Sequence, residues 1–311
     1  MRVPASCPAC TGRLEPWLSL PSGEPADPRR YPLLRCESCA GSVTGGEPPG
    51  EEAYESGTYT AQAPRGAKLV RAFQRLVDAQ PVGLLRRAGL GEGARVLDVG
   101  AGPGRLVASL RQAGLDASGI EPSARSAGRA RAAGLPVAKA SIAEHRDKEL
   151  DGAVLWHVLE HLDDPLDSLR AVAGWLRPGG VLLVGVPNPA SLQARIAGTD
   201  WFHWDVPRHR LHLTPGGLAE LLGRAGFRLE RTSHFVLEHN PFSMWMALLS
   251  RLGLPPAYVF QLLKRNVPVK ASELALLGLA GPPLLPVAMA LESAAAAARG
   301  GGTVAAIARL T

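Results

Sequence analysis

Short apolar runs alternate with amphipathic segments through the middle of the chain, which is the pattern of a parallel sheet whose strands are connected by helices. The apolar runs predict strands at 95–99, 116–120, 137–140, 152–156 and 181–186, and a final strand at 302–310. The amphipathic segments predict helices at 105–113, 123–133 and 165–176. This order predicts an α/β fold with a doubly wound sheet, and Ser123 is placed to cap the second of these helices.

A different apolar pattern precedes the final strand. Residues 241–263 and 274–291 are strongly apolar, and the second stretch runs for eighteen residues without a charge. Eighteen residues are the lower limit for crossing a bilayer, but Pro282, Pro283 and Pro286 interrupt this stretch. We therefore expect a helical insertion at 241–300 and no membrane-spanning helix.

The surroundings of these apolar stretches leave three roles open. Lys264, Arg265 and Lys270 flank them, which suits peripheral contact with anionic lipid headgroups through 241–297. A buried hairpin or a contact between two copies of the chain would have the same sequence pattern. If this segment contacts a membrane, the acceptor of the reaction would be lipid-linked. If it forms a hairpin that only caps the domain, a soluble small molecule is favoured as the acceptor.

The strand at 95–99 leads into a loop with glycines at positions 100, 102 and 104. Glycines let the backbone approach a ligand where a Cβ would collide. A dinucleotide site has the spacing G-x-G-x-x-G, with the pyrophosphate on a helix N-terminus, whereas the spacing here is G-x-G-x-G after an acidic residue, Asp98. This spacing favours S-adenosylmethionine, which has no phosphate. Glu121 ends the next strand, where its carboxylate can accept hydrogen bonds from both ribose hydroxyls.

Together with the segments 119–122, 155–161 and 205–209, this loop resembles the class I S-adenosylmethionine-dependent methyltransferases. The resemblance is strongest to the bacterial branch related to the ubiquinone-biosynthesis methyltransferases, often with a zinc-binding N-terminus, and it covers most of the chain. It implies a Rossmann-like sheet of seven strands with an antiparallel last strand. The expected cofactor-binding residues are Asp98, Gly100, Ala101, Gly102, Gly104, Glu121, Ser141, Ile142 and His157.

The chain departs from this family in one respect. Many members have an aspartate after the third strand that contacts the adenine amino group, but the matching stretch here is Ala-Ser-Ile-Ala at 140–143. We expect the backbone of Ser141 and Ile142 to make this contact instead.

The four cysteines form two C-x-x-C-x-G motifs, which end at Gly12 and Gly41. In a metal knuckle, backbone amides wrap around the thiolate sulfurs, and we expect the glycines to supply the positive φ of the turn. Zinc is the expected metal, iron is an alternative, and two disulfides are a second alternative. A closed site of this kind is structural, because it has no open coordination position. The expected ligands are Cys7, Cys10, Cys36 and Cys39.

Two clusters of titratable residues follow the fourth and fifth strands. His157, Glu160 and His161 have the i, i+3, i+4 spacing that places three side chains on one helical face, where they could hold a divalent metal, provide a base or anchor the helix. A hydroxyl acceptor needs a base with a pKa near 7, for which His209 is the first candidate and His157 the second. A structural role for each histidine is the alternative.

Aromatic residues are candidates for the wall of an acceptor pocket. Tyr54 and Tyr59 resemble family tyrosines that face the substrate. Trp201, Trp204 and His212 belong to the second titratable cluster and are candidate acceptor contacts. For all five residues, packing between parts of the fold is the alternative.

Length and composition agree with one large α/β domain and a small appendage, since the chain has 311 residues of which 46% are hydrophobic. The net charge of +6 includes no run of five basic residues, so nucleic acid is not an expected partner. No secretory leader precedes Cys7, and we expect a cytoplasmic protein with peripheral contact to the inner membrane face as an option. The predicted division is a four-cysteine zinc ribbon at 1–48, linker and N-terminal helices at 49–94, the cofactor-binding core at 95–240, the insertion at 241–300 and the final strand at 301–311.

The function expected from these features is transfer of a methyl group from S-adenosylmethionine to an oxygen or carbon atom. The acceptor would be a small molecule, a sugar nucleotide or a lipid-linked compound. A non-catalytic scaffold that binds S-adenosylmethionine and recruits a partner is the main alternative. An NAD-dependent oxidoreductase is a weaker one.

Overall fold

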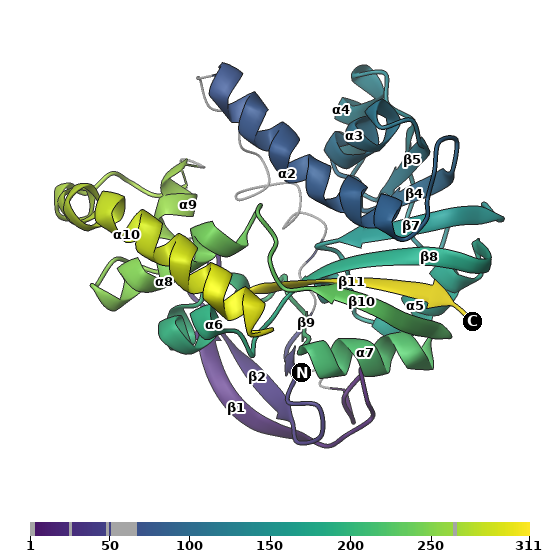
Figure 1. Cartoon of the computed structure of the whole chain (residues 1–311). Coiled ribbons are helices and arrows are strands. Elements are labelled where there is room, and N and C mark those ends of the chain that lie inside the picture. Colours follow the sequence, from purple (N-terminus) through teal and green to yellow (C-terminus); the bar gives the residue numbers. More distant parts are fainter. Residues whose placement is uncertain (1–3, 25–26, 48–49, 51–66, 264–265) are drawn as a thin grey trace.

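A seven-stranded sheet forms the centre of the molecule (Figure 1). The computed structural model describes residues 4–24, 27–47, 50, 67–263 and 266–311. The strand order of the seven-stranded sheet is β10-β11-β8-β7-β4-β5-β6. The strands are β4 (Arg95–Val99), β5 (Asp116–Glu121), β6 (Val137–Lys139), β7 (Leu150–Trp156), β8 (Leu176–Pro187), β10 (Phe227–Ser233) and β11 (Thr303–Leu310).

The direction of the strands confirms the predicted Rossmann-like sheet with an antiparallel last strand. Strands β4 to β8 pair in parallel, and β11 is antiparallel to both of its neighbours. Because β11 lies between β8 and β10, these two strands run in the same direction. The C-terminal end of β10 therefore reaches the edge of the sheet where β4, β5 and β7 also end.

Helices cover both faces of this sheet. Leu85 of α2, Val107 of α3 and Ala127 of α4 belong to the apolar cluster on one face, and Leu169 of α5 and Leu218 of α7 belong to the cluster on the other. The predicted cap is confirmed, because the Ser123 hydroxyl accepts a hydrogen bond from the Ser126 amide at 3.2 Å. The helices are α2 (Ala67–Arg87), α3 (Arg105–Gln112), α4 (Ala124–Ala132), α5 (Pro165–Ala173), α6 (Leu192–Ala197) and α7 (Pro215–Arg224).

The N-terminal segment forms a second sheet that shares its core with the first. Its strands are β1 (Leu14–Pro21), β2 (Arg30–Cys36), β3 (Ser42–Thr44) and β9 (Leu211–His212), so its fourth strand comes from the large domain. Cys7, Cys36 and Val43 lie in the same apolar cluster as residues of the central sheet. The Arg224 guanidinium donates to the carbonyl oxygens of Pro8 and Ala9, at 2.7 and 2.8 Å. The sheet is thus built into the domain and is not a separate appendage.

Three helices form a layer beyond one end of the central sheet, away from the C-terminus (Figure 1). They are α8 (Asn240–Arg251), α9 (Tyr258–Leu263) and α10 (Ala271–Ala297). Within the described residues, α10 alone is long and apolar enough to cross a membrane, and only 11% of its most apolar window is buried. Helices therefore form in the predicted insertion, at 241–300.

The expected interruption of the second apolar stretch by its prolines is wrong, because α10 continues through Pro282, Pro283 and Pro286. Each proline removes the N–H that would bond the carbonyl four residues earlier, and its ring crowds that carbonyl. The carbonyls concerned belong to Gly278, Leu279 and Pro282, which are all exposed. Water can satisfy these oxygens, so the helix continues.

Candidate active site and metal centre

The glycine loop after β4 has the backbone geometry of a ligand cradle. Gly100, Gly102 and Gly104 all have positive φ, at 72°, 53° and 82°. A Cβ on Gly100 would lie 2.7 Å from a Val158 methyl group, whereas around Gly102 no heavy atom lies within 4 Å of that position. The loop is therefore packed at its first glycine and open at its second, which is where a ligand can approach.

The Glu121 carboxylate holds this loop against β5. One oxygen accepts a hydrogen bond from the Gly102 amide at 2.9 Å, and the other accepts from the Ser123 amide at 2.8 Å. Each oxygen of a carboxylate can accept a second bond, so Glu121 can bind ribose hydroxyls while it holds the loop. The Ala140 amide donates to the Glu121 carbonyl at 3.2 Å, which brings the next segment alongside.

Ser141 is engaged in a local contact at the end of β6. Its amide and its hydroxyl both donate to one Glu144 oxygen, each at 2.8 Å. These bonds fix the segment that also contains Ile142, which lies three residues beyond Lys139, the strand partner of Glu121. The adenine contact expected from Ser141 and Ile142 stays a prediction.

Asp98 is buried beneath the loop and 3% exposed. Burial, and then the neighbouring negative charge of Glu121, raise the pKa of Asp98 to about 8, while Arg105 acts in the opposite direction. Two acidic groups thus share a confined space beside the open glycine. Such a site favours a cationic ligand, and S-adenosylmethionine carries a sulfonium.

His157 follows β7 with a positive φ of 57°, a strained conformation for a residue with a side chain. Its Nδ1 lies 3.1 Å from Glu160 Oε1, and its buried Nε2 has no hydrogen-bond partner among the described residues. Burial tends to raise the pKa of Glu160, but the hydrogen bond and the charges of His157 and His161 outweigh it and hold this pKa below its usual value. A buried carboxylate therefore orients an imidazole that has one free nitrogen.

The segment after β10 completes this site with residues that sequence analysis missed. The His239 ring lies 4.2 Å from the His157 ring, and burial is the main cause that lowers the His239 pKa to about 4. Glu238 accepts from the Trp156 indole at 3.1 Å and pairs with Arg105 at the start of α3. These residues could have been found only if β10 were known to run parallel to β8, because that direction brings the segment after β10 to this edge of the sheet. The sequence alone does not give the direction of the strand.

The expectation that His157, Glu160 and His161 share one helical face is wrong. The residues from Leu159 to His161 form a single 3-10 turn. His161 Nδ1 lies 3.0 Å from the Arg208 carbonyl, and its ring lies 4.7 Å from that of His209. Instead, Glu160 and His161 lie together with His209, with ligand atoms within 4.8 Å of one another, and these three residues could hold a cation.

His209 lies in a position that does not support its choice as the first candidate for a base. Its Nδ1 lies 2.8 Å from the His203 carbonyl, and the residue is 8% exposed. Burial is the main cause that lowers the His209 pKa well below its usual value, so the ring is a weak acceptor of protons.

Trp201, Trp204 and His212 lie at the junction between the two sheets. Trp201 donates to Gln193 at 3.1 Å, Trp204 donates to the Gly198 carbonyl at 2.8 Å, and both pack against the buried Leu20 and Leu33 of the N-terminal sheet. His212 Nε2 lies 3.0 Å from the Thr44 hydroxyl. These are the positions of packing residues, not of an open pocket wall. Tyr54 and Tyr59 lie outside the described residues, as do Lys264 and Arg265.

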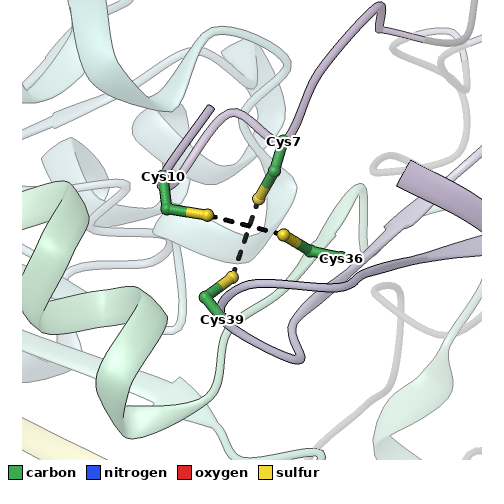
Figure 2. Close-up of side chains that lie close together, drawn as sticks. All are labelled: Cys7, Cys10, Cys36 and Cys39. Carbon is green, nitrogen blue, oxygen red and sulfur yellow. Dashed lines mark hydrogen bonds between the residues drawn. The ribbon is translucent and has the colours of Figure 1, made fainter. Parts of the chain in front are cut away.

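Four cysteine sulfurs converge on one point at the N-terminal sheet (Figure 2). The Cys7 and Cys39 sulfurs are 3.7 Å apart, and those of Cys10 and Cys36 are 3.4 Å apart. These cysteines are free thiols, which disagrees with the two-disulfide alternative. Four converging thiolates are a donor set that fits a structural zinc ion, which would be held by Cys7, Cys10, Cys36 and Cys39.

The glycines of the two motifs serve a purpose other than the expected one. Positive φ occurs one residue earlier, at Thr11 (63°) and Ala40 (56°). Gly12 and Gly41 are needed for close approach instead, because a Cβ would lie 2.9 Å from the Cys36 sulfur and 2.9 Å from the His212 carbonyl. The expectation of positive φ at the glycines is wrong, and the small size of the residue is what the knuckles need.

The sheet order and the glycine loop with its glutamate define a class I S-adenosylmethionine-dependent methyltransferase. Residues 70–232 match a family model described as a methyltransferase domain, and the chain belongs to this family. The family gives no support to the NAD-dependent oxidoreductase alternative.

The chain is similar to several individual methyltransferases. A ubiquinone biosynthesis O-methyltransferase of Bordetella avium is 31% identical over 176 residues, which are 52% of this chain and 72% of that protein. One of Xanthomonas axonopodis pv. citri is 30% identical, over 47% of this chain and 67% of that protein. A crystal structure of a SAM dependent methyltransferase from Archaeoglobus fulgidus has a TM-score of 0.48 at 21% identity and covers 76% of this chain and 94% of that one.

We predict that Cys36→Ser abolishes zinc binding and lowers the stability of the whole domain. The thiolates lie in the core shared by both sheets, so loss of the metal should remove a large part of the unfolding free energy. Elemental analysis should give one zinc per wild-type chain, and denaturant unfolding should show the loss. Ser38→Ala, between the ligands of the second motif, is the control that keeps its zinc. A metal-free wild type of unchanged stability would contradict the assignment.

We also predict that affinity for S-adenosylmethionine rises with pH up to about 8 and that Asp98→Asn removes this dependence. Only the ionised carboxylate attracts a cationic ligand, and below its pKa the ionised fraction grows about tenfold per pH unit. Calorimetric titration across this range measures the slope. Asp116→Asn, on the exposed start of β5, should behave as the wild type. An equally steep slope in Asp98→Asn would remove Asp98 from the site.

Proposed function

We propose that this methyltransferase transfers the methyl group to a hydroxyl oxygen of a small, apolar acceptor, with His157 as the general base. The observation that carries the proposal is the pair formed by His157 and the buried Glu160, with the second nitrogen of His157 free among the described residues. A carboxylate that fixes the tautomer of a histidine leaves the other nitrogen able to take a proton.

The position of His157 and Glu160 beside the cofactor loop supports the proposed role of His157 as the base. Val158, the residue after His157, packs against Gly100 of the loop that cradles the cofactor. Methyl transfer is an in-line attack on a sulfonium carbon, so the enzyme mainly has to align the acceptor, and orientation can contribute about 7 kcal/mol or more. A base adds to this when the acceptor is protonated at neutral pH, as a hydroxyl is.

The surroundings of His157 favour an aromatic or similarly flat acceptor. Trp156, His203 and His239 surround its ring, with ring centroids between 4.2 and 6.5 Å away. Burial keeps the pKa of His203 and His239 below the usual value, so these rings are neutral and present uncharged aromatic faces. The activity for which the relatives are named, O-methylation in ubiquinone biosynthesis, supports oxygen over carbon.

The test is incubation of the purified chain with labelled S-adenosylmethionine and a panel of hydroxylated aromatic compounds with and without alkyl tails. Mass spectrometry should find an O-methylated product. Fractions of cell extract serve as a second source of acceptors. If the chain binds the cofactor but no fraction yields a methylated product, it acts as a cofactor-binding scaffold and the proposal fails.

We predict that His157→Asn lowers kcat by about 10²-fold to 10⁴-fold and changes cofactor affinity by no more than roughly twofold, because a general base contributes this much to the rate. His209→Asn is the matched comparison, and it should lower kcat by less than about tenfold, since its ring is buried and already hydrogen-bonded. Steady-state kinetics with calorimetry distinguish the two. The opposite ranking would assign the base to His209.

A further inference from the structure

Helix α10 exposes an apolar surface that the rest of the described chain does not cover. From position 274 to 291 it has no charged residue. Its buried residues are Gly281, Ala288, Glu292 and Ala295, which lie on one seam along the helix. Its exposed large apolar side chains are Leu274, Leu279, Leu285, Val287 and Met289.

The width of this surface favours a fluid apolar partner over a protein. At about 100° per residue, Leu279 lies on the side of the helix opposite to the seam, and Val287 lies on a third side. These two side chains are 80% and 44% exposed. A helix that is apolar on several sides needs apolar surroundings that reach all of them. Lipid can surround a helix in this way, whereas a folded partner covers a single stripe.

Charge around the helix indicates which lipid surface it fits. The segment 241–300 has five basic residues and two acidic ones. Lys270 at the start of α10 and Arg251 at the end of α8 are exposed, and the exposed Leu252 and Val269 lie next to them in the chain. An apolar surface bordered by cations binds bilayers with anionic headgroups.

The hydrogen bonds between α10 and the domain favour a helix that lies on a membrane over one that crosses it. The buried Glu292 accepts from the Gly302 amide at 2.7 Å and from Gln193 at 3.1 Å, and the Trp245 indole donates to the Gly281 carbonyl at 2.8 Å. These bonds hold the middle and the C-terminal part of the helix to the domain.

We propose that the exposed side of α10 binds the surface of an anionic lipid bilayer as a peripheral anchor. The anchor does not depend on methyl transfer, so its test is separate from that of the proposed reaction. Under the proposed function it has one further consequence: α8 begins at Asn240, directly after His239, so a bilayer beneath α10 lies next to the site for an apolar acceptor.

The experiment is flotation of the full chain with vesicles of phosphatidylcholine, with or without phosphatidylglycerol. We expect binding to the anionic vesicles that weakens as salt is added. Leu279→Glu and Val287→Glu should each reduce binding about tenfold or more, because each places a charge in the apolar contact. Leu76→Glu, at a leucine of α2 that is 60% exposed, is the matched control and should bind as the wild type does.

Circular dichroism and calorimetric titration with S-adenosylmethionine establish that each variant is folded. The two α10 variants change different sides of the helix, so one folded variant is sufficient for the test. Absence of binding to anionic vesicles, or equal binding by a folded α10 variant, would overturn the proposal. A dimer in analytical ultracentrifugation that Leu279→Glu dissociates, without vesicle binding, would assign the surface to a second copy of the chain.

Discussion

The bridge that Glu121 makes between the Gly102 amide and the Ser123 amide is the contact on which the cofactor site depends. It joins the loop after β4 to the start of α4. The segments that follow β4 and β5 therefore form one continuous edge, which we call the rim of the cofactor site. The positive φ values of the loop glycines allow the Gly102 amide to face this carboxylate. Asp98 lies beneath the same rim, and its raised pKa follows from the enclosure that the bridge maintains.

Local sequence signals were sufficient for the rim and the sheet. The glycine spacing, Glu121 at the end of an apolar run and Ser123 as a cap each depend on neighbours within a few residues, and the structure has all three in place. The cluster formed by Glu160, His161 and His209 could not be predicted in the same way. It results from a 3-10 turn that meets a loop some 47 residues further along the chain, as the contact of His161 with the Arg208 carbonyl shows.

Two other differences have the same origin. Gly12 and Gly41 looked like turn residues, but the constraint on them is a sulfur of the opposite knuckle and a carbonyl of β9, both distant in sequence. The prolines of α10 looked like interruptions because sequence does not tell which carbonyls water can reach. In each case the residue type was informative, but the reason for that residue type depends on the tertiary structure.

The position of His239 as the residue that precedes α8 links the outer helices to the reaction site. Within α8, the Trp245 indole donates to the backbone of α10 at 2.8 Å. A shift of α10 would thus be transmitted along α8 to the imidazole that packs on His157. Under the proposed function, acceptor entry and product release would then be coupled to whatever the outer helix touches.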